Sequence, residues 1–186
     1  MFKKLSISIA FIFLDKYCLA HGFGGNGLMH PLTGLDHILA IVAVGAWSAQ
    51  LGGRAIYLVP GSFLIMLFLG GITGIENISV GKIEWLIALS VILLGLSICI
   101  NRKMSLLIAG LAVGIFGFSH GYAHGTELPH TLNVGEYIIG FTITTLGLHV
   151  IGAAGGLLIL EEKNGRNHLR LLGAVTSFIG VYLLFR

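Results

Sequence analysis

The sequence is poor in charged residues and in cysteine. Only 10% of its 186 residues are charged and 55% are hydrophobic, whereas a water-soluble domain carries about 25% charged residues. A chain with so few polar side chains does not cover its own surface with polar groups, so lipid must cover it. The two cysteines, Cys18 and Cys99, lie in apolar surroundings, which leaves no disulfide framework and no thiolate metal cluster.

Basic residues are also few, and they are dispersed. The net charge of +3 comes from lysines and arginines scattered between apolar runs. A nucleic-acid-binding surface gathers such residues on one face, so we expect no nucleic-acid partner and interpret them as membrane-flanking anchors. A nucleotide-binding loop of the Walker type is absent from the sequence, which argues against direct use of ATP.

The sequence is rich in long apolar runs. Six of them follow one another along the chain, each near the length of about 20 residues that a membrane-spanning helix needs. The alternation typical of β-barrel strands is absent. The sequence therefore predicts an all-α, polytopic membrane bundle of six transmembrane helices, at approximately residues 31–50, 54–74, 83–100, 104–124, 134–160 and 168–185.

The first twenty residues have the pattern of an export signal. Lys3 and Lys4 precede an apolar stretch over residues 5–14, and Cys18-Leu19-Ala20 supplies a small-x-small cleavage pattern. The apolar stretch is too short to span a hydrocarbon core of about 30 Å. We expect residues 1–20 to be a cleaved signal peptide and residues 21–186 to form the membrane domain. An uncleaved first helix is the alternative.

The basic residues predict the orientation of the helices. With the leader's lysines held inside, the mature chain begins and ends on the outer side, and most basic residues then fall in inside loops, as the positive-inside rule requires. The inside set is Arg54, Arg102, Lys103, Lys163, Arg166 and Arg170, and the outside set is Lys82 and Arg186.

Two histidine-rich strings interrupt the apolar pattern. They read HPLTGLDH at residues 30–37 and HGYAHGTE at residues 120–127. The predicted topology brings both to the outer side, and imidazoles and carboxylates are costly to place in hydrocarbon unless they have a function. Imidazole suits divalent nickel, zinc, copper and iron. The candidate metal ligands are His30, Asp36, His37, His120, His124 and Glu127.

The spacing within each string supports shared ligation. Pro31 suits the first position of a helix, which would place Asp36 and His37 about 8–10 Å below the helix start. His120 and His124 are one turn apart, and Glu127 joins their face if the helix persists toward Pro129. Two alternatives remain open: Asp36 as an anion drawn to a helix N-terminus, and the histidines as interfacial groups bonded to backbone carbonyls or water.

Three more histidines are candidates for an additional ligand or relay. His149 lies mid-way along the fifth apolar run, where water is scarce; the alternative is a core group bonded to a threonine on a neighbouring helix. His21 would become the mature N-terminus, whose free amine and imidazole chelate a metal together. His130 lies in the loop after the second string.

Glycines form a stripe along the fourth apolar run. Small residues at three- and four-residue steps let helices approach closely in lipid. We therefore expect another helix to pack against Gly110, Gly114, Gly117, Gly121 and Gly125.

The two strings resemble those of the HupE/UreJ family of small bacterial permeases. The resemblance extends to the leader, the six apolar runs and Leu148-His149. It implies a multi-pass protein of the bacterial cytoplasmic (inner) membrane that takes up nickel, or cobalt, for hydrogenase or urease maturation. By position, the family's functional residues would be His30, Asp36, His37, His120, His124 and Glu127.

The leading interpretation is a permease and not an enzyme. The metal ion would be the transported cargo, with no permanently bound cofactor, and the partners would be that ion and the lipid bilayer. A homo-oligomer is compatible with the sequence. The alternative is a membrane-embedded zinc-dependent hydrolase that uses the same ligands to activate water.

Overall fold

The computed structural model describes residues 27–76, 78–80, 83–128 and 133–185. Within them the chain is helical throughout, with no strand, which confirms the all-α prediction. A short 3-10 turn, η2 (His30–Leu32), precedes six helices: α2 (Leu35–Leu51), α3 (Ala55–Ile75), α4 (Glu84–Ile100), α5 (Leu106–Thr126), α6 (Val134–Glu161) and α7 (Gly165–Leu184). The predicted signal peptide, His21 and His130 lie outside the described residues.

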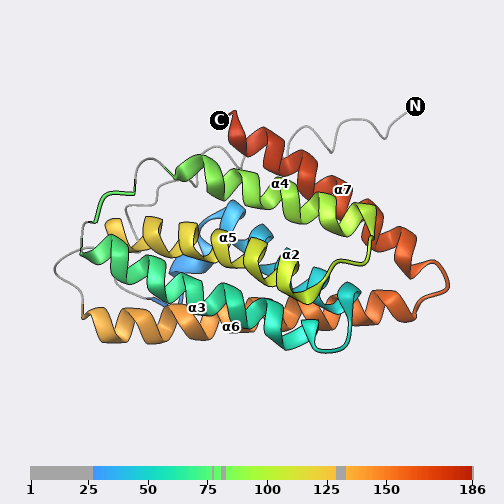
Figure 1. Ribbon diagram of the computed structural model, residues 1–186, viewed down its shortest axis with the longest axis horizontal. Helices are drawn as coiled ribbons and strands as arrows, with labels where there is room; N and C mark the ends of the chain where they lie inside the picture. The colour runs from blue at the N-terminus through green and yellow to red at the C-terminus, as the bar shows by residue number, and fades with distance from the viewer. Residues whose placement is uncertain (1–26, 77, 81–82, 129–132, 186) are drawn as a thin grey trace, which may run out of the picture.

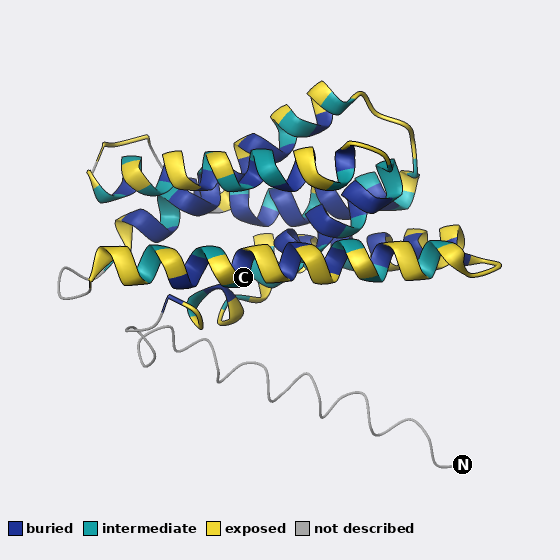
Figure 2. Ribbon diagram, turned by 90° about the horizontal axis from the view of Figure 1, so that it is seen from below, coloured by how far each residue is buried: buried dark blue, intermediate teal, exposed yellow. Residues whose placement is uncertain are grey.

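The helices have the length and the surface of a membrane bundle. Four of those described, α3, α5, α6 and α7, are long and apolar enough to cross a membrane, whereas α2 and the apolar part of α4 are shorter. Exposed residues recur along the outer faces of the helices (Figure 2). Large apolar side chains such as Ile65, Leu107 and Phe178 are among the exposed ones. In water such a surface would be unstable, so it is the surface that lipid covers. The number of spans, six, stays a prediction.

The helices pack as three close pairs. α3 lies against α5, α4 against α7, and α2 against α6. Figure 1 shows α4 and α7 along one long side of the bundle and α6 along the opposite side, with α5 between them. The α2–α6 and α3–α5 pairs also contact each other through α2 and α3, and these two pairs carry the histidine strings.

The glycine stripe of α5 is the contact surface for α3, as predicted. At Gly117, Gly121 and Gly125 a side chain would collide with the α3 backbone, at Phe63, Leu67 and Gly71 respectively. Without side chains at these positions, the two backbones come into direct contact, which is how small residues drive helix association in lipid.

The beginning of α2 differs from the prediction. Pro31 does not open the long helix but lies within the separate turn η2, and α2 begins at Leu35 after the extended Gly34. Asp36 and His37 are therefore in the first turn of α2 and not 8–10 Å along it. The reason is local: Thr33 bonds back to the His30 carbonyl through both its backbone N–H and its hydroxyl, which closes the short turn.

The end of α5 and the start of α6 are fixed by local contacts. α5 ends at Thr126, earlier than Pro129, with Glu127 at its C-cap. α6 begins after Asn133, whose side-chain oxygen accepts hydrogen bonds from the N–H groups of Gly135 and Glu136. This capping satisfies N–H groups that have no partner inside the helix. It also sets Tyr137 and Phe141 on successive turns facing the end of α5.

Candidate metal centre

The two histidine strings meet at one end of the bundle. The ring centroids of His37 and His124 are 4.4 Å apart, those of His30 and His124 4.6 Å, and those of His37 and His120 4.9 Å. Residues more than 80 positions apart in the sequence thus form one cluster, which we call the histidine cluster: His30, His37, His120 and His124.

Three ligand atoms at the end of this cluster are placed to share an ion. One ligand atom each of His30, His124 and Glu127 lies within 4.8 Å of the other two. His124 is buried, His30 is half-buried and Glu127 is exposed, so the group extends from the protein interior to the surface. Two imidazoles and one carboxylate leave further coordination positions open, as in exchangeable metal sites.

The His30–His124 contact is a direct hydrogen bond between rings. His30 Nε2 and His124 Nδ1 are 2.8 Å apart, so one of them donates and the other accepts. When His124 Nδ1–H is the donor, its Nε2 carries a free lone pair, and that atom is buried without a partner among the described residues. A cation bound between these two nitrogens would take a lone pair from each, and the proton between them would move to the other nitrogen of the ring that carried it.

Asp36 holds the neighbouring imidazole of His37. Its Oδ1 accepts a hydrogen bond from the His37 ring Nδ1–H at 2.8 Å and one from the His37 backbone N–H at 2.9 Å. With Nδ1 as this donor, Nε2 presents the lone pair of the neutral ring, and this buried atom has no partner among the residues described. Carboxylates commonly orient metal-binding histidines in this way. The carboxylate of Asp36 faces its own histidine instead of the His30–His124–Glu127 group.

His120 is oriented by the backbone. Its Nδ1 donates to the Phe116 carbonyl one turn earlier at 2.8 Å, and the residue is 1% exposed. In the neutral ring its Nε2 therefore carries the lone pair, and this buried atom also has no partner in the part of the chain that the structure describes. The alternative of histidines bonded to backbone carbonyls thus holds for one nitrogen of His120 and leaves the other free.

His30, which precedes the helices, stays neutral to lower pH than an ordinary histidine. Burial, reinforced by the nearby His37, lowers the pKa of the His30 imidazole. Only the neutral ring has a lone pair for a metal, so the environment of His30 favours the ligating form.

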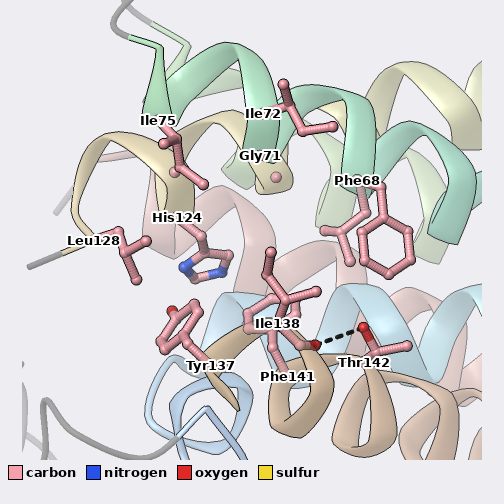
Figure 3. Close-up of a pocket in the computed structure, with 13 residues that line it drawn as sticks. Phe68, Gly71, Ile72, Ile75, His124, Leu128, Tyr137, Ile138, Phe141 and Thr142 are labelled. Carbon is pink, nitrogen blue, oxygen red and sulfur yellow. Dashed lines mark hydrogen bonds between the residues drawn. The ribbon is translucent and has the colours of Figure 1, made fainter. Parts of the chain in front are cut away.

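Aromatic side chains enclose the cluster from α6. Phe141 lies 4.8 Å from the His124 ring and Tyr137 lies 5.6 Å from the His30 ring, measured between centroids. Beside His124 there is an open cavity of about 110 Å³ between α3, α5 and α6 (Figure 3). Of the side chains that line it, only those of His124, Tyr137 and Thr142 carry polar atoms. Sequence reasoning missed these aromatics because, in an apolar helix, they do not stand out from lipid-facing residues.

His149 is not part of the cluster. It lies deeper along α6, with its ring centroid 5.2 Å from that of Phe63. His21 and His130, which fall outside the described residues, cannot be placed relative to the cluster.

Replacing Asp36 with asparagine should weaken metal binding by about 10–100-fold, because the loss of a carboxylate that orients a metal-binding histidine has this typical effect. The amide keeps the shape but no longer fixes the His37 tautomer. Isothermal titration of the detergent-solubilised protein with nickel measures the change. Glu162→Gln is the control, since this exposed carboxylate pairs with His168 away from the cluster. Equal affinities in the two variants would contradict the role given to Asp36.

A family model described as HupE / UreJ protein matches residues 8–183. The chain belongs to the HupE/UreJ family. Among similar proteins, Protein HupE of Rhizobium leguminosarum bv. viciae is 40% identical to it, over 98% of both chains. No solved structure matches the chain.

Family membership, together with the helical bundle, identifies a multi-pass membrane transporter and not an enzyme. HupE/UreJ membership is consistent with a metal ion, nickel or cobalt, as the cargo. The hydrolase alternative is therefore not favoured.

Proposed function

We propose that this HupE/UreJ protein takes up a divalent transition-metal ion, most specifically nickel, with cobalt as the second candidate. The observation that carries the proposal is the convergence of one donor atom each from His30, His124 and Glu127 within 4.8 Å at one end of the bundle. Imidazole nitrogens with a single carboxylate oxygen form a donor set that suits such ions. The exposed Glu127 gives the ion its first contact.

Transfer inward would use the next pair of imidazoles. His120 lies one turn, about 6 Å, inward of His124 on α5, and His37 contacts both rings. Their Nδ1 atoms are engaged in hydrogen bonds, and their Nε2 atoms are buried and without a partner among the described residues. An ion released by Glu127 and His30 would therefore meet two further nitrogen ligands without entering bare hydrocarbon.

The cellular setting of the proposal follows the predicted topology. The cluster would open on the outer side of the bacterial inner membrane, with both mature termini on that side, and His21 and His130 would be additional ligands at the entrance. The ion would serve nickel-enzyme assembly, that of a hydrogenase or a urease. A single chain contains the whole cluster, so a homo-oligomer is not required for capture.

Reconstituted protein should carry nickel. We expect radiolabelled nickel to accumulate in proteoliposomes that contain the protein and not in liposomes without it. Cobalt in excess should reduce nickel uptake, because both ions suit the same imidazole and carboxylate donors. Nickel uptake that excess cobalt leaves unchanged would contradict cobalt as the second candidate, and no nickel uptake at all would contradict the function.

A further inference from the structure

The deep histidine of α6, His149, is buried and makes no close hydrogen bond to a described residue. His149 is 2% exposed, and neither ring nitrogen makes a hydrogen bond to a described residue. Thr145, one turn earlier on the same helix, is fully buried, and its hydroxyl likewise has no partner among the residues that the structure describes. The backbone carbonyl of Thr145 lies near enough to interact with the His149 ring, but no close hydrogen bond to a described residue satisfies either ring nitrogen. Buried polar groups are normally paired, and those at membrane depth commonly mark an ion pathway.

Three helices meet at this histidine. The backbone of α2 comes into contact with the His149 carbonyl at Gly45, where any side chain would collide. From α3, Phe63 places its ring against the imidazole. The site thus lies at the junction of the α2–α6 and α3–α5 pairs and not on a lipid-facing surface.

Phe63 contacts both His149 and the histidine cluster. Its ring centroid is 5.6 Å from that of His120 and 5.2 Å from that of His149, and the residue is fully buried. Its backbone carbonyl lies against Gly117 of α5, which fixes the position of Phe63 on α3. One apolar side chain thus contacts both His120 of the histidine cluster and the deeper His149.

The depth of His149 fits an inner position on a route. Phe141 contacts His124, and His149 follows it by two turns of α6, about 12 Å. On α5, His120 lies about 6 Å deeper than His124, which is about half of this distance. The nitrogen ligands thus recur at successive depths: His124, then His120, then His149.

We propose that His149, together with the Thr145 hydroxyl, forms an inner relay site that receives the metal ion from His37 and His120 past the ring of Phe63. This inference rests on the proposed function, since a relay needs a transported ion. One imidazole and one hydroxyl form a weak site. Weak binding suits a relay, because an ion that is held tightly does not leave.

The test separates binding from transport in His149→Ala and His149→Gln. The relay predicts that nickel affinity, measured by titration in detergent, stays within about 3-fold of wild type, because capture uses the outer ligands. Initial nickel uptake into proteoliposomes should fall on the order of 10-fold or more, the scale on which metal sites respond to a lost supporting group. His168→Ala is the matched control, because this exposed histidine pairs with Glu162 at α7.

A ligand exchange distinguishes a relay from a packing residue. His149→Cys replaces the imidazole with a soft thiolate ligand. This variant should therefore take up the thiophilic ion cadmium, whereas the alanine and glutamine variants should not. Unchanged nickel uptake in the alanine and glutamine variants would overturn the inner site. A nickel affinity that falls as much as nickel uptake does would also overturn it. Equal cadmium uptake by the cysteine and alanine variants would overturn it as well. Absence of uptake by wild-type protein that still binds nickel would instead overturn the proposed function.

Discussion

Replacing His124 with alanine should abolish nickel uptake and lower nickel affinity by more than about 100-fold, beyond the range seen when only a supporting group is lost. His124 is the residue on which the site depends most. It shares the three-donor group with His30 and Glu127, bonds to His30, and contacts the ring of His37. Without His124, no imidazole nitrogen connects the outer donors, His30 and Glu127, with the deeper imidazoles of His37 and His120.

The measurement is nickel titration in detergent together with uptake into proteoliposomes. His168→Ala removes a histidine of the same kind from an exposed position and should change neither. A second variant, His124→Gln, fills much of the volume that alanine leaves empty, so a loss of affinity common to both His124 variants is due to the ligand and not to a packing defect. Nickel affinity near that of wild type in both would remove the basis for the site.

Much of the fold could be predicted from the sequence because lipid leaves few options. Apolar runs near 20 residues long must be helices, since an unpaired backbone is too costly in hydrocarbon. The runs predicted for α3 and α6 match the observed helices to within one residue at each end. Around α2 the prediction was wrong because a proline at a helix start and a proline in a separate short turn give the same sequence pattern; the contacts of Thr33 decide between them.

The site could be predicted in composition but not in arrangement. Histidine and carboxylate are conspicuous in an apolar chain, and the topology indicated which end of the bundle they share. Which donors face one another depends on side-chain contacts that spacing does not reveal. The Asp36 carboxylate bonds to the neighbouring His37, whereas Glu127 joins His30 and His124. Metal ligation by any of these residues stays a prediction.

The aromatic residues around the site carried no signal in the sequence. Phe63 lies in an unbroken apolar stretch of α3 and differs in no local respect from Phe68, which is exposed. Its contact with both His120 and His149 results from the packing of α3 on the α5 glycines. The glycine stripe predicted this packing but not which side chain it would place against the histidines.

Gly121→Ala should destabilise the protein and weaken nickel binding, although the change adds one methyl group. A Cβ at this position would collide with the backbone of Leu67 and Gly71 on α3. Overpacking a core costs about 1–3 kcal/mol, and rigid backbone on the opposing helix places this case near the upper end. For a protein of this size, the thermal midpoint would fall by roughly 6–12 °C.

The same substitution at Gly110 provides the control, because it lies on the same stripe of the same helix. A Cβ at Gly110 would come no closer than 3.7 Å to the Ser62 side chain, so Gly110→Ala should leave the thermal midpoint nearly unchanged. Gly121 adjoins His120 and precedes His124 by one turn, so a shift of α5 away from α3 moves both ligands. Gly121→Ala should therefore lower nickel affinity as well as stability, whereas Gly110→Ala should lower neither. Equal midpoints for the two variants would show that direct backbone contact between α3 and α5 does not hold the histidine cluster together.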